Sequence, residues 1–286
     1  MGIKTKISWA DATWNPVTGC LHGCEYCYAR KIAERFEPYE IYDPEMALQR
    51  HAIANKQLIG LGAPYVLDFP WQQRNKNGTI QNAPYPFGFA PTFHRYKLDE
   101  PARWTRPRNI FVCSMADLFG DWVPDEWIDD VIKSTQRALQ HRYLFLTKNP
   151  ERYGEWLERF ETCSIDGLDE VENCWFGASA SNNAELERAN RSKAQWVSIE
   201  PIRERIETDE GQFIEFNPYT GAKRKRWVWV VIGAETGNSK NKVAPKREWI
   251  DDIVDACEDY GTPVFMKESL RTMMGDDFRQ EFPWEV

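Results

Sequence analysis

Short apolar runs alternate along the chain with longer segments in which apolar residues recur every three or four positions. The runs predict β-strands at 109–113, 142–146, 174–178, 195–199, 227–232 and 263–266, with a less distinct first strand just before Cys20. The longer segments predict helices from 124 to about 140 and at 150–160, 184–192 and 246–260. This alternation favours parallel strands joined by crossover helices, so we expect an α/β fold with a partial or complete parallel (β/α) barrel.

A long connection, residues 36–108, follows the first predicted βα unit. Connections of this length are usually lids or binding loops, so we expect it to shape a substrate pocket, with a platform that docks a partner as the alternative. Within it, His94 and Arg95 are the candidates for substrate contact. The whole chain, 1–286, is most economically a single barrel domain that carries this insertion at about 36–108.

Polar residues follow the predicted strands at one exit after another. In a parallel barrel these exits converge on one rim, where catalytic groups come from several strand ends. Polar residues are also ordinary at turns and helix caps, so a single exit indicates little, whereas six in succession favour a functional rim. The exits are Ser114-Met115-Ala116-Asp117, Thr147-Lys148-Asn149, Ser179-Ala180-Ser181-Asn182, Glu200-Pro201, Ala234-Glu235-Thr236-Gly237 and Lys267-Glu268-Ser269.

The composition of the chain indicates the cellular compartment in which it folds. The 286 residues include seven cysteines, an odd number without regular spacing, which argues against a secreted disulfide framework and for a reducing environment. The N-terminal segment has no apolar signal core, and no apolar stretch approaches the length of a membrane span. We therefore expect a cytoplasmic protein that does not act at a membrane.

The net charge of −8 repels polyanions, so nucleic-acid binding would need a local basic surface. One candidate is the run Lys223-Arg224-Lys225-Arg226. The other is residues 94–108, where basic and aromatic side chains are interleaved as phosphate contact and base stacking require. For either segment alone, a solvated strand edge or a packed surface loop is the more ordinary interpretation.

Three cysteines lie in the run Cys20-Leu-His-Gly-Cys24-Glu-Tyr-Cys27, spaced as three thiolate ligands of one iron–sulfur cluster with no fourth cysteine nearby. An iron without a protein ligand is a Lewis-acid site open to a small molecule. The alternatives are a four-thiolate electron-transfer cluster and a structural zinc site completed by His22. Closed zinc sites usually pair two separated ligand couples rather than four groups within eight residues.

This spacing resembles the signature of radical S-adenosylmethionine (SAM) enzymes, in which three cysteines hold a [4Fe–4S] cluster and SAM chelates the fourth iron. Tyr26, the aromatic residue before the last cysteine, is part of that pattern. The whole chain resembles the phage and bacterial three-Cys-motif family of unknown function, a radical-SAM-like group. Beyond the cysteine loop, the matching pieces are Pro91-Thr92-Phe93-His94, Ser114-Met115-Ala116-Asp117-Leu118-Phe119, Leu146-Thr147-Lys148-Asn149-Pro150-Glu151-Arg152, Ser198-Ile199-Glu200-Pro201 and Ile232-Gly233-Ala234-Glu235-Thr236-Gly237. At Ala234 the family has a second glycine.

A more distant resemblance is to spore photoproduct lyases, radical-SAM enzymes that repair a thymine dimer in DNA. It rests on the cysteine loop, on the exit from Cys113 to Asp117 and on the Thr147-Lys148 exit. It implies that polar residues at the rim hold SAM, Lys148 at its carboxylate and an acid at its ammonium. The cofactor-binding candidates are Tyr26, Ser114, Asp117, Lys148, Ser179, Glu200, Gly233 and Glu235.

Cys113 has two interpretations. The lyase resemblance implies a thiol that returns a hydrogen atom to a product radical, whereas cysteine is commonly buried as a small hydrophobic residue.

The resemblance implies a radical-SAM barrel in which a reduced cluster cleaves SAM and the resulting 5′-deoxyadenosyl radical abstracts hydrogen from a substrate. The favoured substrate is a nucleobase or nucleic acid, for modification or repair, and a peptide or protein is the alternative. From a different class comes a non-catalytic iron–sulfur sensor or scaffold. The partners implied are a one-electron donor such as flavodoxin or ferredoxin and a separate three-Cys-motif partner protein.

Overall fold

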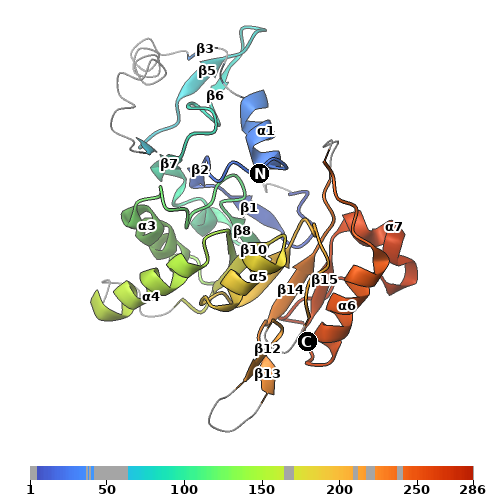
Figure 1. Cartoon of the computed structure of the whole chain (residues 1–286). Helices are drawn as coiled ribbons and strands as arrows, with labels where there is room; N and C mark the ends of the chain where they lie inside the picture. Colours follow the sequence, from blue (N-terminus) through green and yellow to red (C-terminus); the bar gives the residue numbers. More distant parts are fainter. Residues whose placement is uncertain are drawn as a thin grey trace. The chain divides into compact units, whose positions relative to one another are not determined.

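A computed structural model describes residues 5–36, 38, 40–41, 64–163, 171–208, 212–216, 223–236 and 241–285, coloured along the sequence in Figure 1. The chain divides into two compact units. Unit 1 consists of Met1–Lys4, Ala12–Tyr143 and Gly167–Asn173, and unit 2 of Thr5–Asp11, Leu144–Asp166 and Cys174–Val286. The single domain with a lid at about 36–108 stays a prediction.

Seven strands form one hydrogen-bonded sheet in the order β1-β8-β9-β10-β11-β14-β15. Their bounds are β1 Ala12–Trp14, β8 Asn109–Val112, β9 Arg142–Thr147, β10 Cys174–Ala180, β11 Trp196–Ile199, β14 Trp229–Ile232 and β15 Val264–Met266. The pairs β1–β8, β10–β11, β11–β14 and β14–β15 are parallel. The α/β class is therefore confirmed, and the parallel sheet is compatible with a partial barrel.

The helices between these strands follow the predicted pattern. They are α3 (Asp125–Thr135), α4 (Glu151–Cys163), α5 (Asn183–Asn190) and α6 (Arg247–Glu258). Residues at helical spacing are buried in each of the two helices with similar sequences, Ile128, Val131 and Ile132 in α3 and Ile250, Ile253 and Val254 in α6. Each predicted strand overlaps an observed one, because continuous apolar runs are typical of strands buried on both faces.

Unit 1 also contains short elements that the apolar pattern did not predict. Helix α1 (Tyr28–Arg35) follows the cysteine loop directly. There are also two small sheets, β2-β7-β4 and β3-β5-β6, whose strands come from the range predicted as a lid except for β2, which precedes the cysteine loop. Their strands are β2 Val17–Thr18, β3 Glu40–Ile41, β4 Tyr65–Leu67, β5 Gln72–Arg74, β6 Ile80–Asn82 and β7 Thr92–His94, followed by the 3-10 turns η2 (Arg95–Lys97) and η3 (Pro101–Arg103).

Unit 2 has an aromatic core. The rings of Trp9, Trp196 and Trp229 meet at centroid distances of 5.2 to 6.2 Å, and each is almost completely buried. An antiparallel ribbon of β12 (Ile214–Phe216) and β13 (Lys223–Lys225) precedes β14 (Figure 1). The unit ends with η4 (Glu268–Leu270), α7 (Arg271–Met274) and η5 (Gly275–Asp277).

Within the residues described, the structure contains no helix long and apolar enough to cross a membrane.

Candidate functional site

The cysteine loop of unit 1 begins at a glycine that no other residue can replace without displacing its neighbours. Gly19 has φ of +89°, and a Cβ built on it would lie 2.2 Å from the carbonyl oxygen of Ala90. The backbone N–H of Gly19 donates to Met115 O at 2.9 Å, and that of Cys20 donates to Phe89 O at 3.3 Å. The loop is therefore fixed at its start by the exit of β8 and by the insertion.

The end of the loop is fixed by α1. Cys27 is the N-cap residue of this helix, and its Sγ accepts a hydrogen bond from the backbone N–H of Arg30 at 3.3 Å. The guanidinium of Arg30 turns back and donates to Cys20 O at 3.2 Å, while it lies 4.8 Å from the ring centroid of Phe89. Arg30 was not a sequence candidate, because its contact with Cys20 depends on how the loop closes.

The three thiols differ in surroundings but act on one another. Cys20, Cys24 and Cys27 are all partly exposed, as is Tyr26 between them. Burial is the main cause that raises the pKa of Cys20 to about 12, and the negative charges of Asp117, Cys24 and Cys27 raise it further.

The thiols are not arranged around a single ion. Among the described residues, no group of three or more His, Cys, Asp or Glu side chains is placed so that it could hold a metal ion. A cubane cluster makes a different demand, because each thiolate binds its own iron. Three other cysteines are buried outside the loop: Cys113 directly after β8, Cys174 in β10 and Cys257 in α6.

The exit of β8 packs against the exit of β1. Asn15 Oδ1 accepts hydrogen bonds from Ser114 Oγ at 3.1 Å and from the backbone N–H of Met115 at 3.0 Å. Tyr28 in α1 donates its hydroxyl to Ser114 O at 2.8 Å. The hydroxyl of Ser114, predicted to bind SAM, is thus used inside the protein in this conformation.

Cys113 begins this exit in a conformation that side chains rarely adopt, with φ of +56°. Its thiol is buried, and burial is the main cause that raises its pKa to about 12, with the charge of Asp117 adding to it. The thiol therefore keeps its proton at neutral pH.

Asp117 is also committed. One carboxylate oxygen accepts a hydrogen bond from His22 Nε2 at 2.7 Å, and the other accepts the backbone N–H of Phe119 at 3.1 Å. Sequence interpretation treated His22 as an alternative zinc ligand and Asp117 as a SAM ligand. It missed their contact, since 95 residues separate them.

In unit 2, Lys148 follows β9 and reaches the neighbouring strand. Its Nζ donates to Ser179 Oγ at 3.3 Å and lies 3.8 Å from Glu185 Oε2. Glu185, in the first turn of α5, also accepts the backbone N–H and the hydroxyl of Ser181 at 2.7 and 2.9 Å. Lys148 and Ser179 are therefore brought together as predicted site residues, while Glu185 was not a candidate because its position resembles an ordinary helix-start acid.

A second group in unit 2 joins the exits of β11, β14 and β15. Lys267 Nζ pairs with Glu200 Oε2 at 2.5 Å, and the side chain of Glu200 fills the space where a Cβ on Gly233 would lie, 3.1 Å from Oε1. Glu235 is 5% exposed, and its Oε2 has no hydrogen-bond partner in the part of the chain described. A buried carboxylate oxygen in this state can accept an N–H or O–H from a ligand.

The insertion candidates occupy different environments. His94 is completely buried, with Nε2 2.8 Å from Thr18 Oγ1 and Nδ1 3.3 Å from the hydroxyl of Tyr96. Burial lowers its pKa well below the ordinary value, so the ring is neutral. Arg95 is exposed and pairs with Asp68 at 2.6 Å. Their contact with a substrate stays a prediction, and in this conformation His94 supports the packing of β2 and β7.

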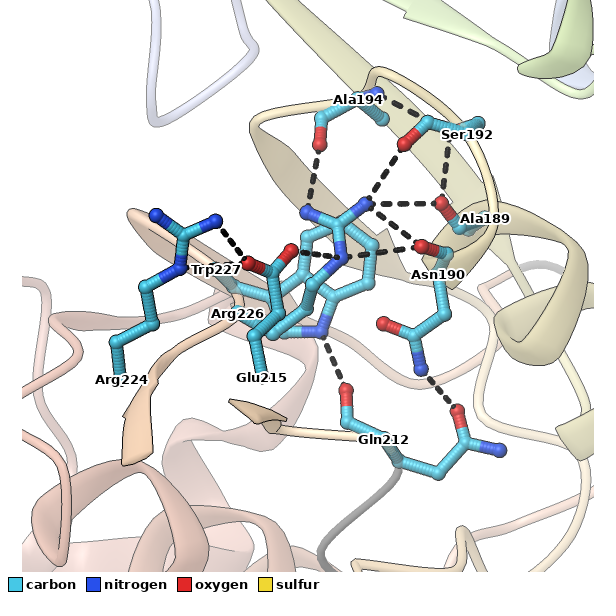
Figure 2. A network of polar contacts seen from close by, with 9 residues as sticks. All are labelled: Ala189, Asn190, Ser192, Ala194, Gln212, Glu215, Arg224, Arg226 and Trp227. Carbon is cyan, nitrogen blue, oxygen red and sulfur yellow. Dashed lines mark hydrogen bonds and ion pairs between the residues drawn. The ribbon is translucent and has the colours of Figure 1, made fainter. Parts of the chain in front are cut away.

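The basic run 223–226 is not one surface. Lys223, Arg224 and Lys225 are exposed on β13, but the side chain of Arg226 is only 8% exposed. Figure 2 shows its guanidinium among four backbone carbonyls at and after the end of α5, those of Ala189, Asn190, Ser192 and Ala194. The interpretation of this run as a continuous basic patch was wrong at Arg226, which stabilises the carboxyl end of a helix.

Comparison with known proteins gives a family and no activity. No curated protein and no solved structure matches the chain. A family model described as a protein of unknown function, DUF5131, matches residues 4–272. The resemblance to radical-SAM-like families stays a prediction beside this result. Since the match covers most of the sequence, the chain belongs to the DUF5131 family.

Proposed function

We propose that this protein is a radical-SAM enzyme that acts on a nucleobase or nucleic acid, in modification or repair. The observation that supports it most is the loop of Cys20, Cys24 and Cys27, fixed at both ends and with its three thiols partly exposed. Three cysteines and no fourth in the loop are the donor set of a [4Fe–4S] cluster with one open iron.

The residues fit such a group. Burial is the main cause of the raised pKa of Cys20, and the charges of Asp117, Cys24 and Cys27 add to it; iron bound to the sulfur would replace the proton that this thiol otherwise keeps. Arg30 adds a positive charge beside the loop. His22 Nε2 is bonded to Asp117, which disfavours the Cys3His zinc alternative through that nitrogen.

When bound, the cluster and SAM supply one-electron chemistry that removes a hydrogen atom from a substrate. The chain would orient SAM through groups at the strand exits. Lys148 offers a cation to a carboxylate, and Glu235 offers a buried acceptor to an ammonium or a ribose hydroxyl. Tyr26, Ser179, Glu200 and Gly233 complete the proposed set. Cys113 keeps its S–H bond at neutral pH, which is the form that a hydrogen-atom donor needs.

Reconstitution tests this proposal. Anaerobic protein is loaded with iron and sulfide, then given dithionite and SAM, and 5′-deoxyadenosine is measured. We expect a brown chromophore, four irons per chain and release of 5′-deoxyadenosine, all lost in Cys24→Ala and kept in Cys257→Ala. One equivalent of zinc without a chromophore would contradict the cluster, and a cluster without SAM cleavage would favour a sensor or scaffold.

Substrate class needs its own measurement. The stretch from Phe93 to Arg108 contains cation–aromatic pairs, such as Arg108 over Trp104 at 5.4 Å and Arg95 over Phe93 at 5.7 Å. Arg95 is exposed, and Arg108 and Trp104 are partly exposed, although the ring of Phe93 is buried. Basic and aromatic side chains at a surface suit phosphates and bases. We expect an oligonucleotide to shift in a salt-sensitive way and to lose this shift in a variant with Arg95 and Arg106 changed to Gln. An unchanged shift would contradict the role of this stretch, and no binding at all would favour the peptide alternative. A flavodoxin or ferredoxin and a three-Cys-motif partner protein remain the proposed partners.

A further inference from the structure

His22 lies within the cysteine loop, two residues after Cys20 and two before Cys24, but its ring is directed to the exit of β8. Its Nε2 is 2.7 Å from Asp117 Oδ2, in a pair whose side chains are 23% and 7% exposed. Such a short, partly buried contact between an imidazole N–H and a carboxylate is among the stronger hydrogen bonds in proteins. The loop is therefore tied to the strand exit by a side chain as well as by its backbone.

The same exit supports both members of the pair. Asp117 Oδ1 accepts the backbone N–H of Phe119 at 3.1 Å, which fixes the orientation of the carboxylate. The ring of Trp122, five residues after Asp117, meets the ring of His22 edge-on at 4.9 Å between centroids. His22 thus has a polar contact and an aromatic contact with one segment, and its rotamer is determined by both.

The backbone of the loop also contacts the exit of β8. Gly19 forms an isolated parallel bridge with Ala116, next to the hydrogen bond from Gly19 N to Met115 O. Gly19 is therefore attached to residues 115–116 through the backbone, and the His22–Asp117 bond attaches the loop a second time, three residues further on. Cys20 lies between the two points of attachment.

We propose that His22 and Asp117 are a positioning pair, which holds the cysteine loop in the geometry that binds the cluster and places a negative charge near it. This inference rests on the proposed function, and it gives Asp117 a different role from the binding of SAM's ammonium. Both oxygens of Asp117 are used within the protein, one by His22 and one by the backbone N–H of Phe119. Groups that orient metal ligands typically change metal affinity by about 10–100-fold when removed.

A double-mutant cycle tests the pair. We expect His22→Ala and Asp117→Ala each to lose the cluster to a chelator at least tenfold faster than the wild type. The double variant should lose it no faster than the faster of the two single variants. His22→Gln, which keeps an N–H at similar reach, should restore most of the retention. Additive losses, or no rescue by Gln, would overturn the pairing.

The reduction potential separates positioning from SAM binding. Asp117→Asn keeps an acceptor oxygen but removes the charge, so the potential of the cluster without SAM should shift upward while the affinity for SAM changes less than twofold. Asp121→Asn, the same change four residues along, is the matched control and should leave the potential unchanged. A fall in SAM affinity with an unchanged potential would identify Asp117 as a SAM ligand and overturn the proposal.

One measurement does not require the cluster. In the iron-free chain, the rate at which Cys20 is alkylated can be followed by mass spectrometry. We expect His22→Ala and Asp117→Ala to increase this rate to the same extent, and the double variant to increase it no further. Equal folding is checked by near-UV circular dichroism. If the wild type binds no iron, the proposed function fails, and the alkylation rates still decide whether the pair holds the loop; unchanged rates would refute it.

Discussion

Two arginines use the same chemistry in the two units with different results. In unit 2, Arg226 lies 4.1 Å from the ring centroid of Trp227 and donates to four backbone carbonyls, with Glu215 as its counter-ion (Figure 2). In unit 1, Arg30 lies 4.8 Å from the ring centroid of Phe89 and donates to one carbonyl, that of Cys20. The first network joins protein groups to one another, whereas the second borders three thiols. A closed network is typical of structural support, and an open one of a ligand site.

The largest expected effect is at Arg226. Arg226→Met removes the donors that satisfy the end of α5, so we expect the free energy of unfolding to fall by about 3–5 kcal/mol. Denaturant titration measures it. Arg224→Met is the control: this side chain is 77% exposed and pairs with Glu215, and its loss should cost less than about 1 kcal/mol. Equal losses in the two variants would mean that the buried contacts of Arg226 contribute no more to stability than the exposed ion pair of Arg224.

The next largest effect on stability is expected at Gly19, at the start of the cysteine loop in unit 1. Gly19→Ala forces a side chain into a left-handed conformation and against Ala90 O, and we expect a loss of about 2–3 kcal/mol together with loss of iron binding. Gly23→Ala is matched, because its φ is +70° but no atom lies within 4 Å of its Cβ, so strain alone should cost about 1–2 kcal/mol. Iron content and denaturant titration separate them; equal losses would exclude the contact with Ala90 as a cause.

Arg30 tests the comparison directly. Arg30→Gln removes one hydrogen bond and one cation–π contact, and we expect a cost of about 1–2 kcal/mol, well below that of Arg226→Met. Because the loop would lose a support, cluster retention should fall by a larger factor than global stability implies. A loss as large as that at Arg226 would place Arg30 among the structural arginines.

The smallest effect is the pH dependence that His94 gives to unit 1. Its folded pKa is lowered, so the folded state binds fewer protons than the unfolded state. The folded state therefore has its full stability above the pKa of an unfolded histidine, about 6.5. As the pH falls below this pKa, the free energy of unfolding decreases by at most about 1.4 kcal/mol per pH unit. His94→Gln should flatten the stability profile between about pH 6.5 and 5.5. Burial also lowers the pKa of His141, so part of the slope should persist; a steeper profile in the variant would contradict the sign.

The sheet could be predicted because its strands are continuous apolar runs separated by amphipathic helices. All six strands predicted at named positions overlap observed strands, and the four predicted helices are present. The small sheets of the insertion could not be predicted, since strands such as β6 (Ile80–Asn82) are only three residues long and exposed, and so lack an apolar run. Helix α1 was missed because it has only eight residues, four of them charged, and its N-cap is a cysteine rather than an ordinary capping residue.

The types of residue at the candidate site could be predicted from the sequence, but the contacts between them could not. The spacing of the cysteines and the polar strand exits are visible in the sequence. The partners of Asp117 and Ser114 are not, because His22 and Asn15 are 95 and 99 residues away. Arg226 was misread for a related reason: four adjacent basic residues indicate a charged surface, but the chain bends directly after β13, and Arg226 contacts backbone carbonyls at the end of α5, about 35 residues earlier in the chain.

The contact between Gly19 and Ala90, together with the bond from Cys20 N to Phe89 O, limits how this protein can be recombined with its relatives. Residues 89–91 of the insertion contact the start of the cysteine loop, so the two segments must be inherited as a unit. A chimera that exchanges residues 64–88 should keep a working loop, whereas one whose junction replaces residues 89–91 should not.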